Sequence, residues 1–70
     1  MWIKIDEILY NFENIHRIEI NKRDEIFDLF IRDEKNSEII FQGSKKECLD
    51  KYLLIQNGIL KDKKLIDLDE

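Results

Sequence analysis

Proline is absent from this 70-residue chain, and glycine, cysteine and histidine are nearly absent, with two, one and one copies. The single cysteine, Cys48, excludes an internal disulfide and is typical of a reducing compartment, so we expect a soluble cytoplasmic protein. The single histidine, His16, has no second histidine and no organised carboxylates beside it, so it does not form a metal site. We therefore expect no cofactor, no metal and no small-molecule ligand.

Long apolar runs and an excess of basic charge are also missing. The longest uncharged run, Tyr52 to Leu60, is too short to span a bilayer, and charged residues interrupt the N-terminus before a signal peptide could develop. The net charge is −4, and residues 1–43 alone carry six basic and ten acidic side chains. Because no segment is long enough to span a bilayer, we expect no membrane partner. Neutralisation of phosphate by basic side chains dominates nucleic-acid affinity, so an acidic chain is also not expected to bind nucleic acid.

What remains is a small chain that is 43% hydrophobic and 40% charged, a composition that argues against disorder. Seventy residues form one domain, 1–70, and a domain of this size buries only about 60% of its unfolded surface. The pattern predicts an α+β fold, with an antiparallel β-meander over 1–43, a helix over 44–58 and a C-terminal segment over 59–70. The meander is expected to form a curled sheet or a small partial barrel packed by that one helix.

Short alternating apolar segments indicate five strands in the meander. We expect them at residues 2–5, 8–12, 15–20, 25–32 and 38–42. In the last hairpin, pairing Leu29 with Phe41 and Ile31 with Ile39 matches apolar residues on the inner face.

Two registers remain open for the preceding hairpin. One pairs Arg17 with Asp28 and joins opposite charges, whereas the other pairs Ile20 with Phe27 and joins apolar side chains. Cross-strand pairs contribute only about 0.2–1 kcal/mol each, so these pairs do not decide between the registers.

The predicted helix has a clear start and a clear stop. Ser44 with Glu47 three residues later forms a capping box, and Asn57-Gly58 is a good C-terminal signal because glycine adopts the left-handed conformation without strain. Ser44, Glu47 and Gly58 are thus assigned structural roles at the helix ends. For the segment after the helix, a short final strand, a fraying helix and a tail all remain open.

Candidate catalytic features have simpler structural explanations. Residues 43–46, Gly-Ser-Lys-Lys, superficially resemble a phosphate-binding loop, but the cap accounts for Ser44, which leaves at most weak anion binding. Cys48 could pair only with His16, and a buried core cysteine is the expected state. The acidic pairs at residues 6–7, 24–25 and 33–34 fall at turns, where solvation explains them. No catalytic residue is assigned, and we expect no enzyme.

One face of the predicted meander is less easily explained. If Leu29 and Phe41 face the helix, the opposite face carries an apolar cluster, and a contiguous exposed cluster usually marks an interface. The candidate partner-binding residues are Ile15, Ile26, Phe30 and Ile40. In the alternative arrangement, the first two strands, with Trp2, Tyr10 and Phe12, curl over this face.

A recognisable sequence pattern is formed by the runs Trp2–Asp6, Ile8–Ile15, Ile39–Phe41 and Ser44–Glu47. They resemble a diffuse group of short bacterial and phage proteins of unknown function, with a pleckstrin-homology-like strand meander ending in a helix. The resemblance covers residues 1 to about 57 and implies a curled antiparallel sheet closed by the helix. It brings no catalytic residue, and Lys61–Glu70 falls outside it.

These observations favour a small non-catalytic interaction module that binds a protein partner or itself, as a homodimer, through the open sheet face or an edge strand. The alternative is a mobile-element-encoded inhibitor of a host defence system, similar to anti-CRISPR proteins, because an acidic surface can compete for a basic groove. An uncharacterised small enzyme is the third class.

Overall fold

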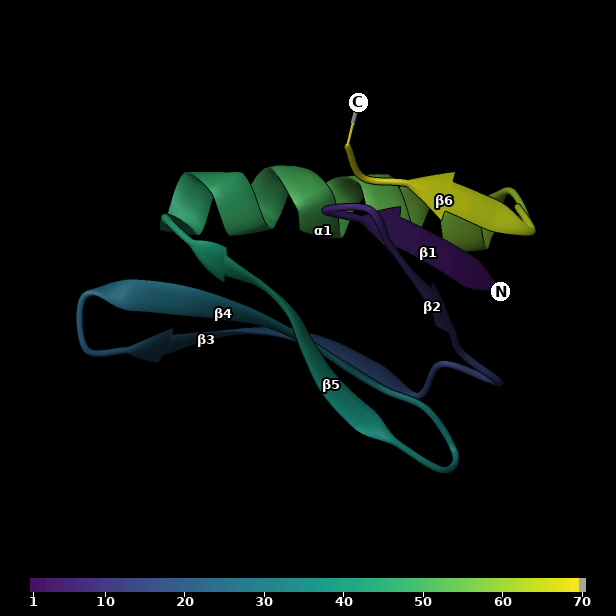
Figure 1. The fold of residues 1–70 in the computed structure, drawn as a ribbon, viewed down its shortest axis with the longest axis horizontal. Coiled ribbons are helices and arrows are strands. Elements are labelled where there is room, and N and C mark those ends of the chain that lie inside the picture. Colours follow the sequence, from purple (N-terminus) through teal and green to yellow (C-terminus); the bar gives the residue numbers. More distant parts are fainter. Residues whose placement is uncertain (70) are drawn as a thin grey trace.

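Six strands and one helix make up the described part of the chain, residues 1–69 of the computed structural model (Figure 1). In chain order the elements are β1 (Trp2–Ile5), β2 (Ile8–Asn11), β3 (Arg17–Arg23), β4 (Ile26–Arg32), β5 (Ser37–Gly43), α1 (Lys45–Leu60) and β6 (Leu65–Asp67). The α+β class and the single helix following a set of antiparallel strands are confirmed. Glu70, the last residue of the predicted C-terminal segment, lies outside the described residues.

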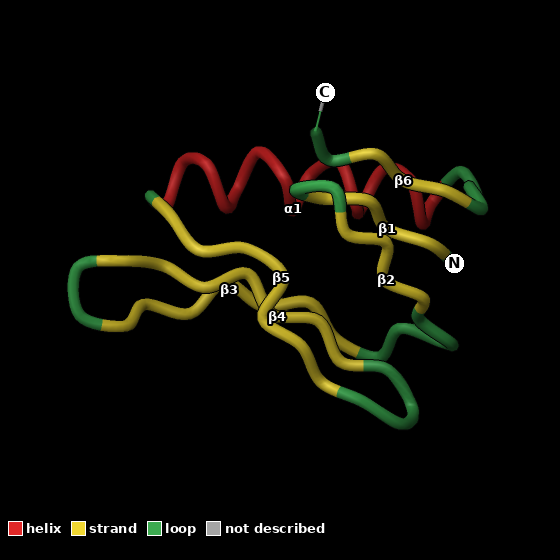
Figure 2. Tube along the Cα trace, in the orientation of Figure 1, coloured by secondary structure: helices red, strands yellow, loops and turns green. Residues whose placement is uncertain are grey.

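The strands form two three-stranded sheets, and neither is closed into a barrel (Figure 2). Sheet A has the order β2-β1-β6, and sheet B is the meander β3-β4-β5. Asp6 and Glu7, with φ of 51° and 64°, join β1 to β2 in the left-handed turn conformation that suits a two-residue hairpin. Among the three states left open for the C-terminal segment, the strand is the observed one, because β6 runs parallel to β1 with Leu65 beside Trp2.

The register between β3 and β4 differs from both registers considered above. Ile20 pairs with Leu29 and Ile18 pairs with Ile31. Only two residues, Asp24 and Glu25, lie between the strands, and Asp24 has a φ of 55°. With the turn at these two residues, Ile20 pairs two residues further along β4 than in the register that joins it to Phe27.

A register shift interrupts the pairing of β4 with β5. Leu29 pairs with Phe41 as predicted, but the shift between Leu29 and Phe30 sets Phe30 opposite Ile39. Because an irregularity of one residue exchanges the two faces of a strand, Ile40 turns inward and is buried. The expectation that Ile40 lies on the open face is wrong, and Ile39 takes that place.

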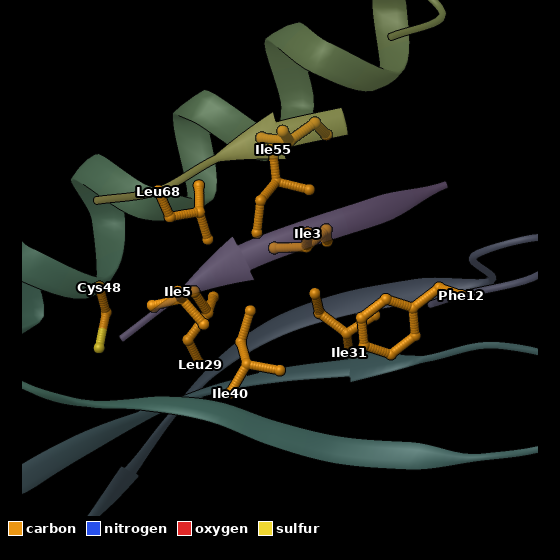
Figure 3. Close-up of a cluster of buried hydrophobic side chains, with 10 residues drawn as sticks. Ile3, Ile5, Phe12, Leu29, Ile31, Ile40, Cys48, Ile55 and Leu68 are labelled. Carbon is orange, nitrogen blue, oxygen red and sulfur yellow. The ribbon is translucent and has the colours of Figure 1, made fainter. Parts of the chain in front are cut away.

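The core lies between the inner face of sheet B, the inner face of sheet A and the helix. Figure 3 shows side chains from β1, β4, β5 and α1 pointing toward one another in this space. The buried set consists of Ile3, Ile5, Phe12, Leu29, Ile31, Ile40, Cys48, Ile55, Ile66 and Leu68. Sheet A thus packs on the helix side of sheet B, so the alternative in which the first two strands cover its outer face is wrong.

The helix begins as predicted and ends later than predicted. The Ser44 Oγ accepts the Glu47 N–H at 3.1 Å, and the Glu47 Oε1 accepts the Ser44 N–H at 3.1 Å, which confirms the capping box. The bond from the Ser44 N–H lowers the pKa of the Glu47 carboxyl.

Gly58 is a buried residue inside α1, so its assignment as the helix stop is wrong. The helix continues to Leu60, and the Lys61 N–H bonds back to the Asn57 carbonyl. A Cβ atom on Gly58 would lie 2.5 Å from Cδ1 of Ile66. Glycine is needed here because β6 crosses the helix at close range, and not for a left-handed conformation, since no glycine among residues 1–69 has a positive φ.

Candidate protein-interaction surface

The four residues predicted to bind a partner do not come together on one surface. Ile26 is exposed and Phe30 is half-buried on the outer face of sheet B, whereas Ile40 is in the core. Ile15 lies on the helix side, in the groove between the start of β3 and α1, near Ile59. The predicted cluster is therefore reduced to Phe30 with its cross-strand neighbour Ile39 and, near the hairpin, Ile26.

Polar contacts occupy most of the outer face of sheet B. The buried carboxylate of Asp28 accepts hydrogen bonds from Gln42 Nε2 at 2.9 Å and from Arg23 Nη2 at 3.3 Å. On β3, Glu19 pairs with Arg17 and accepts a hydrogen bond from the Asn21 side chain. These groups bond to one another across and along the strands. The face thus resembles the solvated side of an antiparallel sheet more than an interface.

The outer face of sheet A carries a second apolar cluster, whose three members are all large and exposed. Trp2, Leu9 and Leu65 are exposed by 45%, 57% and 51%, and they line one hollow on this face. Leu65 is the direct neighbour of Trp2 on β6, and Leu9 is its diagonal neighbour on β2, opposite Lys4. We call these three residues the Trp2 patch.

Strand alternation explains why the Trp2 patch is exposed. Ile3 and Ile66, the next residues in β1 and β6, point to the opposite face and are buried in the core. The core therefore uses only one face of sheet A. The three large apolar side chains on the other face make no contribution to that core.

The charges around the Trp2 patch are separated along the strand direction. At one end, Lys64 borders the patch, and Lys61 and Lys63 lie in the same turn before β6. We call the residues 61–64 the basic end. The opposite end holds the β1–β2 turn and the C-terminal side of β6, and its charged members are Lys4, Asp6, Glu7, Asp67 and Asp69. We call this group the acidic end.

Contacts within the acidic end hold its geometry. Lys4 Nζ donates to Asp69 Oδ2 at 2.9 Å, and the Asp6 N–H donates to Asp69 Oδ1 at 2.8 Å. The bond to Asp69 raises the pKa of Lys4, while the Asp6 N–H and then Lys4 lower the pKa of Asp69. Lys4 and Asp69 are thus both kept in their charged forms.

A second apolar surface runs along the helix. Leu49, Leu53 and Leu60 are exposed and recur every three to four residues on one side of α1, with Gln56 between them. This side adjoins the groove that Ile15 lines. The stripe has no separated basic and acidic ends comparable to those of the Trp2 patch.

Cys48 and His16 do not form a pair. Cys48 is buried, its Sγ–H donates to the Phe27 carbonyl at 3.4 Å, and burial raises its thiol pKa. His16 is exposed, with Nε2 at 4.0 Å from Glu34 Oε1. Among residues 1–69 no group of three His, Cys, Asp or Glu side chains is placed to hold a metal ion.

Asp33 has a structural role that its place in an acidic turn does not indicate. Its Oδ1 accepts the N–H groups of Lys35 and Asn36 at 2.9 and 2.7 Å, and its Oδ2 accepts the Glu13 N–H at 3.0 Å. The side chain therefore ties the segment after β2 to the β4–β5 hairpin, and these bonds lower its pKa. The expectation that this carboxylate is simply solvated is wrong.

No family model, no curated protein and no solved structure gives a significant match to the chain. The resemblance to small proteins with a pleckstrin-homology-like meander therefore stays a prediction. No helix in the described residues has the length and apolar character needed to cross a bilayer. The sequence contains one signal for the Trp2 patch: Trp2 and Leu65 are each followed by an isoleucine, and consecutive residues of a strand point to opposite faces. It did not indicate which of the alternating residues would face outward.

Proposed function

We propose that the protein is a non-catalytic module that binds a protein partner through the Trp2 patch on the open face of sheet A. The observation that carries this proposal is the contiguity of Trp2, Leu9 and Leu65, each about half exposed on one three-stranded face. Contiguous exposed apolar groups usually mark an interaction site, and tryptophan is enriched among residues that dominate binding energy.

The size of the patch limits the apolar contribution to binding. At roughly 200 Å² per large apolar side chain, three half-exposed side chains leave on the order of 300 Å² to bury. At about 25 cal/mol per Å², burial contributes about 7 kcal/mol before association costs of at least about 4 kcal/mol are subtracted. The patch alone therefore supports weak binding, and polar contacts around it must add to the affinity.

Affinity capture with matched variants tests the proposal. The bait is the whole chain, either unchanged or carrying Trp2→Glu, and Ile26→Glu is the control because Ile26 is similarly exposed on sheet B. We expect unchanged and Ile26→Glu baits to retain the same proteins, including the bait chain itself, and Trp2→Glu to lose them. Equal retention by the Trp2→Glu bait would contradict the proposal, and loss on Ile26→Glu alone would place the binding surface on sheet B.

The same capture separates the proposal from its alternative. Recovery of a nuclease or another nucleic-acid-binding protein through the Trp2 patch would support inhibition of a host defence system by binding. Recovery of the bait chain alone would favour self-association.

A further inference from the structure

We infer that the occupant of the Trp2 patch is a second copy of this chain, docked face to face with its strands reversed. The inference rests on the proposed function of the Trp2 patch and adds the identity of the partner. It depends on the charges at the two ends of the patch. The basic end carries three lysines and Asp62, a formal charge of +2, and the acidic end carries four carboxylates and Lys4, a formal charge of −3.

This distribution of charge is complementary to itself in one orientation. Most homodimers have a twofold axis and use the same surface on both subunits. When the axis lies in the plane of the sheet and across the strands, the basic end of each copy covers the acidic end of the other. An axis along the strands would instead bring like charges together, which is unfavourable at short range.

The sequence around Leu65 fits the favourable orientation. Lys63 and Asp67 lie two residues before and after Leu65, and they carry opposite charges. When the axis passes through the row of Trp2 and Leu65, these two residues face the same two residues of the other copy. Asp67 of one copy then approaches Lys63 of the other. The apolar centre is then flanked by two equivalent sets of opposite charges.

The area predicts a weak dimer. Two copies of the patch offer at most on the order of 600 Å² of exposed apolar side chain, which is below the roughly 1,200–2,000 Å² of stable specific complexes. Attraction between the charged ends adds orientation and association rate and is screened by salt. We therefore expect a dimer that forms at high protein concentration and low ionic strength and dissociates as salt is added.

Charge exchange tests the orientation directly. One variant carries Lys63→Glu with Lys64→Glu, and the other carries Glu7→Lys with Asp67→Lys; circular dichroism checks that both remain folded. Each variant has two ends of the same sign, so each should lose self-association by about tenfold or more in sedimentation velocity. An equimolar mixture of the two should recover it, because every contact then joins opposite charges.

Tryptophan fluorescence follows the same reaction, since Trp2 is the only tryptophan. The unchanged chain and Leu53→Ser, a control on the equally exposed helix stripe, should show a blue shift as concentration rises, and the Trp2-patch variant Leu65→Glu should not. A mixture of charge variants that stays monomeric, or an unchanged chain that stays monomeric at low salt, overturns the inference. If Trp2→Glu nevertheless abolishes capture of another protein, the proposed function stands without the second copy; if it has no effect on capture either, both are wrong.

Discussion

Replacing Gly58 by alanine should destabilise the protein, although alanine is the better helix former. In the interior of a helix, Gly→Ala contributes about 0.5–1 kcal/mol of stability. At this position the added Cβ would lie 2.5 and 2.6 Å from Cδ1 and Cγ1 of Ile66, which is buried in β6. Overpacking of this kind costs about 1–3 kcal/mol, so after the helix gain is subtracted we expect a net loss of up to about 2.5 kcal/mol.

The Ile66→Ala background supplies the matched control. It removes both clashing atoms and leaves only Cβ of Ile66, which would lie 3.7 Å from the new methyl group. Ile66→Ala itself should cost about 2–5 kcal/mol, a large share of the stability of a small domain, so all four proteins are compared in sulfate buffer. In that background Gly58→Ala should become stabilising by about 0.5–1 kcal/mol.

Urea unfolding followed by circular dichroism measures the four free energies of unfolding. The reversal of sign between the two backgrounds is the diagnostic result. A stabilising effect of Gly58→Ala in the otherwise unchanged chain would refute the close approach of β6 to the helix.

Three further outcomes follow from single side chains. Ser44→Ala should lower the free energy of unfolding by about 1 kcal/mol in the same urea assay, and a change below about 0.3 kcal/mol would contradict the cap. The folded pKa of Asp33 is lowered, so its contribution to stability is present above the ordinary aspartate pKa of about 3.9 and is lost as pH falls through the folded value. The difference in melting temperature between Asp33→Asn and the unchanged chain should therefore shrink on acidification. A difference that stays constant with pH would contradict this role of Asp33. Cys48 should react slowly with a thiol reagent in the native protein and rapidly in urea, since its thiol is buried with a raised pKa, and equal rates would contradict the burial.

Features determined by neighbouring residues were predictable from the sequence. The capping box depends on two residues three positions apart, and the strands of the meander follow from local alternation. The assignment of Cys48 to the core is likewise confirmed. A small apolar residue on the apolar stripe of a helix is buried when that stripe packs against a sheet.

Features determined by distant contacts were not predictable in this way. The parallel pairing of Trp2 with Leu65 joins the two ends of the chain, and no local pattern marks it. It also changes the role of Gly58, which looks like a helix stop until β6 is placed against it.

The candidate surface was misplaced for a related reason. Alternation alone put Ile40 beside Phe30 on the open face, but the register shift after Leu29 exchanges Ile39 and Ile40. A shift of one residue depends on how the whole hairpin packs, and the strand sequences do not show it. Alternation therefore points to the outer face of sheet B, whereas Trp2, Leu9 and Leu65 line one hollow on sheet A.

We propose that the outer face of sheet A makes the contacts of this protein, in preference to sheet B and the helix stripe. Amide chemical shifts recorded by NMR over a dilution series at low salt test it most directly. We expect concentration-dependent shifts at Trp2, Leu9 and Leu65 and in residues 61–64, with Phe30 and Leu53 unchanged. Shifts confined to Phe30 and Ile39, or to the helix stripe around Leu53, would contradict it.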